Sequence, residues 1–126
     1  MTNGKNEIRD FDDLDAWKVA HSLVLDIYIE TKGFPREEMF SLISQLRRAV
    51  VSITSNIAEG FSRYHFKDKI RFYYHSRGSV SEVKNQIIIA RDLEYLNEEQ
   101  VIIIINKCNQ VKKLINGLIR SIEKQS

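Results

Sequence analysis

Apolar residues recur every three or four positions along most of this chain, which predicts amphipathic helices and not strands. Short polar breaks, some with Gly or Pro, separate the periodic segments, and we expect helices over about residues 14–31, 41–62, 66–93 and 98–123. The last is the most regular, because its apolar positions alternate by three and four from Val101 to Ile122. Short connections and this spacing predict an all-α fold, an antiparallel up-and-down four-helix bundle.

Residues that start or stop helices stand at the breaks. Gly33 and Pro35 suit the end of the first helix, and Ser41 is the expected N-cap of the second. Asn97 is followed by Gln100 at the spacing of a capping box. Residues 1–12 lack periodicity, and we expect them to form a flexible N-terminal arm. Residues 13–126 then form a single bundle domain.

The second segment carries a narrow polar stripe beside its apolar arc, where an ordinary surface helix has a face dense in Lys and Glu. The third segment has a similar stripe. We interpret the two stripes as one interhelical hydrogen-bond network that sets the register of the bundle, with Arg48 and Glu59 as half-buried partners. A binding or catalytic groove is the alternative. The predicted network comprises Gln45, Arg48, Ser52, Asn56, Glu59, Ser76, Ser79, Glu82 and Gln86.

Two runs of β-branched residues, 87–89 and 101–105, place apolar side chains all round their helices. We therefore expect burial on every side there. Because both runs lie toward the third connection, that end of the bundle is the candidate contact between copies of the chain.

Composition excludes several classes of protein. The chain has 126 residues, 43% hydrophobic and 29% charged, as in a single globular domain. Its one cysteine, Cys108, cannot form an intramolecular disulfide, and its first residues lack the apolar core of a signal peptide, so we expect a cytoplasmic protein. The apolar runs are too short to span a bilayer, and no membrane partner is expected.

Catalytic motifs are absent from the sequence. There is no P-loop, dinucleotide-binding fingerprint, CxxC, HExxH or GxSxG. His21, His65 and His75 do not have the spacing of metal ligands, and Cys108 lies on the apolar seam of the last helix. His21 is expected at the edge of the core with its ring hydrogen-bonded. We therefore predict a non-enzymatic protein without a metal or other cofactor.

Residues 63–77 interleave five basic side chains with five aromatic ones. Cations neutralise phosphates and aromatic rings stack on unpaired bases, so the run is compatible with nucleic-acid binding, although Phe66, Ile70 and Tyr73 are needed for the core in any case. A solvated basic face beside core aromatic residues is the alternative interpretation. The net charge of +2 permits a polyanion partner without requiring one. The candidate binding residues are Arg47, Arg63, Lys67, Lys69, Arg71, Tyr74, Arg77, Lys112 and Lys113.

The run Gln45–Ala49 followed by Ser52–Gly60 resembles the signature of the bacterial 23S rRNA intervening-sequence proteins, a family of four-helix-bundle proteins. Further matching segments extend the similarity over about residues 11–120. They include Trp17–Lys18, Phe34–Pro35, Arg77–Val80 and Ala90–Leu93.

This resemblance implies a four-helix bundle that assembles as a homopentamer. It also relates the chain to the accessory variability determinant protein of diversity-generating retroelements, a basic pentameric bundle that binds nucleic acid and its reverse transcriptase. The expected function is thus that of a non-enzymatic oligomer that binds RNA, DNA or a nucleic-acid enzyme such as a reverse transcriptase. The alternative is a structural or protein-interaction scaffold without nucleic-acid binding.

Overall fold

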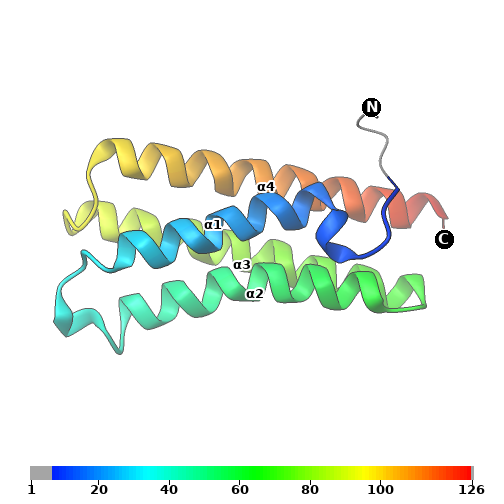
Figure 1. Cartoon of the computed structure of the whole chain (residues 1–126), viewed down its shortest axis with the longest axis horizontal. Coiled ribbons are helices and arrows are strands. Elements are labelled where there is room, and N and C mark those ends of the chain that lie inside the picture. The colour runs from blue at the N-terminus through cyan, green and yellow to red at the C-terminus, as the bar shows by residue number, and fades with distance from the viewer. Residues whose placement is uncertain (1–6, 126) are drawn as a thin grey trace.

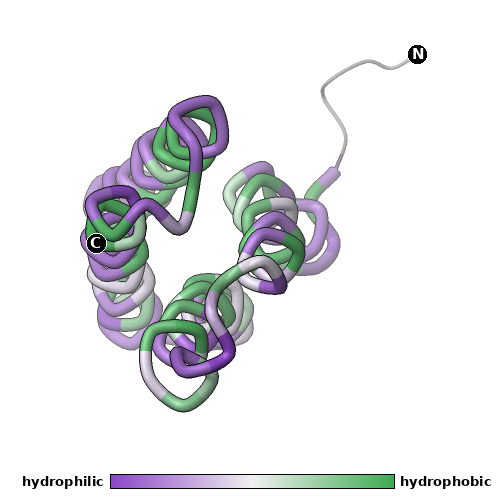
Figure 2. The backbone as a smooth tube through the Cα atoms, turned by 90° about the vertical axis from the view of Figure 1, so that its left-hand side faces the viewer, coloured by the Kyte–Doolittle hydropathy of each residue, from purple (hydrophilic) through white to green (hydrophobic). Residues whose placement is uncertain are grey.

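A computed structural model describes residues 7–125, which fold as four α-helices packed antiparallel in a bundle (Figure 1). This confirms the predicted fold class, and the helix boundaries agree with the predicted ones to within two residues. Seen from the end at which α1 stops, the helices surround one common axis, and each packs against two neighbours (Figure 2). The helices are α1 (Asp15–Thr31), α2 (Leu42–Ser62), α3 (Phe66–Asp92) and α4 (Glu98–Gln125), with short 3-10 helices η1 (Phe11–Asp13) and η2 (Arg36–Glu38).

The predicted flexible arm falls partly outside the described residues, since residues 1–6 are not among them. Its last part is ordered as η1. The Asp10 carboxylate accepts the Phe11 N–H at 2.8 Å, and the Asp13 carboxylate accepts the Arg9 N–H at 2.8 Å. The hydrogen bonds that the Asp13 carboxylate accepts from the Arg9 and Asp10 backbone N–H groups hold the pKa of Asp13 below its ordinary value. The Phe11 ring then meets Trp17 edge-on, with centroids 5.5 Å apart.

The apolar arc predicted for α2 lies in the core, with Leu46, Val50, Ile53 and Ile57 fully buried. Heptad-like spacing predicts that the apolar stripe of α1 runs through Leu14, Trp17, His21, Val24, Tyr28 and Thr31, widened by Ala20, Leu23 and Ile27, and the middle of this stripe is placed wrongly. Ala20, Leu23 and Ile27 face the core, whereas Trp17 and Val24 are half-buried at its edge and His21 and Tyr28 are exposed. Compact aliphatic side chains fill the space between closely packed helices, while residues with a polar atom lie where that atom reaches water. His21 thus stacks on Trp17 with ring centroids 4.7 Å apart.

The apolar seam of α4 is buried from Val101 to Ile115, as predicted. It then shifts, because Ile119 is buried while Leu118 and Ile122 are only half-buried. The prediction that residues 87–89 and 101–105 are buried on every side is wrong for the single chain. Ile89, Ile102 and Ile103 are between two fifths and about half exposed, and the outer side of α2 is likewise open to solvent around Val51 and Ser55.

The helix ends differ in how their backbone groups are capped. Asn97 and Gln100 form the predicted capping box, with both hydrogen bonds at 2.8 Å. Ser41 precedes α2 but its hydroxyl donates to Glu38, whose carboxylate accepts the Leu42 N–H at 3.3 Å, so Glu38 caps the helix. At the end of α3, Glu94 is left-handed with φ of 63°. The Glu94 and Tyr95 N–H groups bond back to α3 as in a Schellman motif.

The two ends of the bundle have different construction. Helix α1 begins short of one end, so that this end consists only of the end of α2, the start of α3 and the end of α4 (Figure 1). We call it the three-helix tip. The other end, which we call the closed end, contains the end of α1, η2 and the connection between α3 and α4. Among residues 7–125, no helix is long and apolar enough to cross a membrane.

Gly60 allows α2 and α3 to approach closely next to the tip. A Cβ atom at this position would lie 2.7 Å from the Tyr73 ring, far inside contact distance. Gly78 has no such role, because a Cβ there meets nothing within 4 Å. Close approach at Gly60 thus fixes how the short connection between the two helices leaves the bundle.

Candidate nucleic-acid interface

The tip begins with a connection of three residues, Arg63–His65, between α2 and α3. Arg63 folds back along α2, where its guanidinium donates to the Glu59 carboxylate at 2.8 Å. It also lies over the Phe72 ring, 4.7 Å from the centroid, and Arg71 approaches the same ring at 5.1 Å. Phe72 is thereby flanked by two cations, which raises the positive charge at the base of α3.

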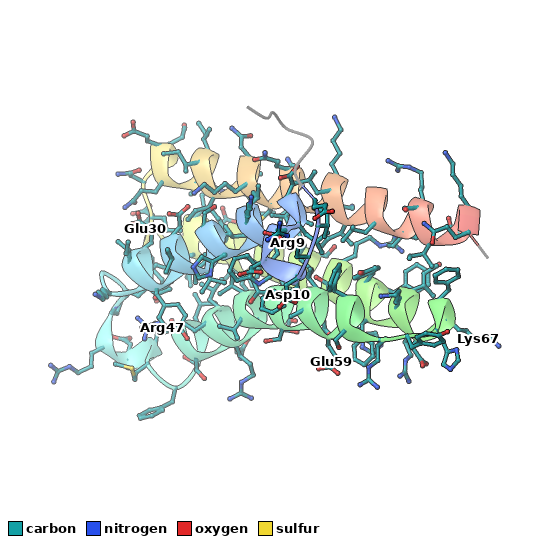
Figure 3. All side chains as sticks on the ribbon, turned by 45° about the vertical axis from the view of Figure 1, so that its right-hand side comes forward. Arg9, Asp10, Glu30, Arg47, Glu59 and Lys67 are labelled. Atoms are coloured by element: carbon teal, nitrogen blue, oxygen red, sulfur yellow. The ribbon has the colours of Figure 1, made fainter. Side chains whose placement is uncertain are left out.

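The exposed predicted cations of α3 and α4 lie along the half of the bundle that contains the tip. Lys67 is exposed at the extreme end (Figure 3), and Arg71 is exposed one turn later, 4.0 Å from Asp68. Lys112 and Lys113 are exposed on α4. Within residues 7–125, the side chains of Lys67, Lys112 and Lys113 form no hydrogen bond or ion pair. Their charges are available to an external anion.

Arg77 and Tyr74 form a unit between α3 and α4. The Arg77 guanidinium donates to the Asn116 side-chain oxygen at 2.9 Å and lies 5.1 Å from the centre of the Tyr74 ring. One face of Tyr74, a predicted stacking residue, is therefore covered by a cation of the same chain.

The two remaining candidates, Lys69 and Arg47, are bound by other groups of the same chain. The Lys69 ammonium donates to the Phe61 carbonyl at 2.7 Å, which caps the end of α2, and partial burial lowers the pKa of this lysine. Arg47 lies toward the closed end (Figure 3). There it donates to the Thr31 hydroxyl at 3.0 Å and covers the Tyr28 ring at 4.7 Å. Both side chains stabilise helix ends; Lys69 adds charge at the tip but its ammonium is already bound there, and Arg47 lies toward the other end.

The polar stripes of α2 and α3 meet along part of their length. The Ser52 and Ser79 hydroxyls are 2.9 Å apart, and the buried Ser76 hydroxyl donates to the Ile53 carbonyl at 2.8 Å. Asn56 donates to the Ser52 hydroxyl at 3.0 Å within α2. Gln86 donates to Gln45 at 3.5 Å, a weak contact that leaves the buried Gln86 Oε1 without a partner.

The outer members of the predicted network do not take part in it. Arg48 and Glu59 are three helical turns apart on α2 and cannot pair; Glu59 binds Arg63 instead. Within the described chain, Arg48 and Glu82 form no hydrogen bond or ion pair. Both face an open groove of about 500 Å³ between α2 and α3, which is lined by Phe40, Ser44, Gln45, Arg48, Ala49, Ser52 and Glu82.

The sequence interpretation missed Tyr64, which is 89% exposed at the tip. The sequence interpretation selected side chains that share one face of a helix. Tyr64 lies in the connection between Ser62 and Phe66, so it belongs to no helical face. The short length of the connection was the available signal, since an aromatic residue in so tight a turn has no helix to pack against.

Catalytic chemistry has no visible centre in residues 7–125. No group of three or more His, Cys, Asp or Glu side chains there could hold a metal ion. Cys108 is fully buried, and burial raises the pKa of its thiol to about 12, which keeps it protonated and unreactive.

Comparison with known proteins agrees with this architecture. A solved structure from Bacteroides thetaiotaomicron, described as a protein of unknown function from the S23 ribosomal protein family, has a similar fold with a TM-score of 0.78. The two sequences are 22% identical, and the match covers 87% of this chain and 98% of the other. No curated protein matches the sequence. Residues 12–117 match the family model of the 23S rRNA-intervening sequence proteins, and the chain belongs to that family.

Proposed function

We propose that this protein is a non-enzymatic homo-oligomer, a pentamer by family resemblance, that binds nucleic acid through the three-helix tip. The supporting observation is the concentration of charge there. Residues 63–77 and 112–124, which form the tip and extend to the middle of α4, together carry nine Lys and Arg against Asp68 and Glu123, and Glu59 at the end of α2 is a third acid. Lys and Arg side chains displace the counterions condensed around phosphate groups, and this release drives binding without a base-specific contact. Several tips in one oligomer would add avidity.

A nucleic-acid enzyme such as a reverse transcriptase is the protein partner that fits this function. A basic oligomer bound to a template would bring the two together, as the relationship to the retroelement accessory protein suggests. Nucleic-acid binding itself is tested by titrating labelled RNA and DNA with the purified oligomer at several salt concentrations. We expect affinity to fall steeply as salt rises. Absence of binding to both polymers at low salt contradicts the proposal.

A scaffold without nucleic-acid binding is the second candidate, and the groove between α2 and α3 favours it. Arg48 and Glu82 offer opposite charges there without a partner in the described chain. A neighbouring copy could supply the complementary charges. In that case, Arg48→Ala with Glu82→Ala changes the oligomeric state in analytical ultracentrifugation, and the wild-type protein binds neither polymer.

A further inference from the structure

We infer that the three-helix tip recognises unpaired nucleotides of a single strand, by stacking a base on Tyr64 and receiving another in the adjoining apolar cleft. The inference rests on the proposed function, because it names the form of nucleic acid that the same surface binds. Three features of the tip support it: an open aromatic ring, an apolar cleft and a lysine that lines the cleft.

Tyr64 supplies the open ring. Its exposed fraction of 89% leaves the ring accessible, and its one aromatic neighbour, His65, meets it at 86° with centroids 5.1 Å apart. The other aromatic residues of the basic run are less available. Phe72 and Tyr74 are covered by guanidinium groups, and Tyr73 is buried. A base that stacks at the tip therefore finds its platform at Tyr64.

The cleft lies between α3 and α4, and its first lining residue, Phe66, follows Tyr64 by two positions. It has a volume of about 260 Å³ and is lined by Phe66, Ile70 and Ile122, with Lys67 as its one charged residue. It exists because α1 begins short of the tip and leaves these apolar side chains partly uncovered (Figure 1). A flat, apolar base face suits such a lining, while the Lys67 ammonium can neutralise the adjacent phosphate.

Single strands fit this surface better than duplexes do. A base within a duplex is stacked on both faces and paired at its edge, so that it would have to flip out before it could reach Tyr64 or the cleft. Unpaired bases require no such step. A second copy of the chain is a poorer occupant, because two tips meeting face to face would bring their basic side chains together.

The test compares a labelled single strand with a duplex of the same sequence, using fluorescence anisotropy and the full chain. We expect wild-type protein to favour the single strand. Tyr64→Ala should weaken single-strand binding by about 5-fold to 100-fold, the range for loss of one stacked base, and leave duplex binding unchanged. Tyr64→Phe should bind as wild type. Phe40→Ala, which removes a 96% exposed ring at the closed end, is the matched control and should also bind as wild type.

The possible outcomes separate the two proposals. Equal affinity for single strand and duplex, or unchanged single-strand binding by Tyr64→Ala, overturns the inference and leaves the proposed function intact. Failure of the wild type to bind either form overturns both. A direct optical readout is available because Trp17 is the only tryptophan. With Trp17→Phe in place, Tyr64→Trp should lose fluorescence on binding a single strand, whereas Phe40→Trp should not.

Discussion

The two ends of the bundle differ in their helices and in their charge. Residues 63–77 and 112–124, which form the tip and extend to the middle of α4, carry nine basic and two acidic side chains, whereas residues 26–38 and 91–99 at the closed end carry eight acidic and three basic ones. Figure 3 places Lys67 at the tip and Glu30 toward the opposite end. A net charge of +2 conceals this separation. The comparison teaches that the distribution of charge along the bundle axis, and not its sum, indicates the partner.

The ends also differ in how they use polar contacts. At the closed end, three of the eight carboxylates bind α4 or the connection before it: Glu38 accepts the Tyr95 hydroxyl at 2.8 Å, and Asp26 and Glu30 pair with Lys107 and Gln100 on α4. Lys67 at the tip and Lys113 at the middle of α4 have no partner within the described chain. Bound groups stabilise the helix connections, while unbound cations remain free for a ligand.

Reversing charge at the tip and on the adjoining half of α4 should produce the largest effect. We expect Lys67→Glu with Lys113→Glu to weaken nucleic-acid binding by about 10-fold to 100-fold and to lower the salt slope by about two or more. The matched control, Lys32→Glu with Arg36→Glu, makes the same charge change at exposed residues of the closed end. Equal losses in both variants would show that total charge and not its location governs binding.

Gly60→Ala tests the close packing that positions the tip. The new methyl group would lie 2.7 Å from the Tyr73 ring, so the helices must separate. We expect the free energy of unfolding to fall by about 1–3 kcal/mol, as measured by urea denaturation. Gly78→Ala on α3 should instead raise it by up to about 1 kcal/mol, because alanine favours helix and the site is open. Unchanged stability in Gly60→Ala would refute the packing role.

Glu94→Gly tests the backbone of the closed end. Glu94 has a left-handed φ of 63°, a conformation that disfavours residues with a side chain. Glycine should raise the free energy of unfolding by about 0.5–1 kcal/mol without affecting nucleic-acid binding. Glu98→Gly, which places glycine inside the first turn of α4, should be destabilising. If Glu94→Gly also destabilises, the connection does not need this φ.

Acid should weaken the closed end through Glu38. Hydrogen bonds from Ser41 and Tyr95 lower the pKa of this carboxyl from its ordinary value of 4.5. Its contribution to stability is therefore full above about pH 4.5 and is lost as pH falls through the lowered pKa. Glu38→Gln should lose less stability than wild type over that range in pH-dependent thermal melts. Glu37→Gln, its neighbour in η2, is the control and should lose as much as wild type.

Much of the fold could be predicted from the sequence, because periodicity reports which side of a helix meets its neighbours. Periodicity correctly placed Ile53 of α2 and Ile104 of α4 in the core. The facing of α1 was less predictable, since Trp17 and His21 are large enough to belong to a core yet lie at its edge. Periodicity also does not show where one helix begins or ends relative to its neighbours. Because α1 begins short of the tip, Phe66 and Ile122 are partly uncovered.

The candidate site was less predictable, because cations on a helix can turn to solvent or to a neighbouring helix end. Lys69 and Arg47 cap helices, whereas Lys67 is free. Sequence spacing does not separate these cases. For Arg48 and Glu59 the spacing was sufficient, because eleven residues of one helix put them about three turns apart, too far to pair.

The most direct test of the central claim is a map of where nucleic acid touches the chain. Backbone amide signals of the protein are followed by NMR while a short single strand is added. We predict that the largest shifts fall in residues 63–77 and 112–124, and that residues 26–38 and 91–99 remain unperturbed. Shifts concentrated at the closed end, or spread evenly along the bundle, would contradict the assignment of function to the three-helix tip.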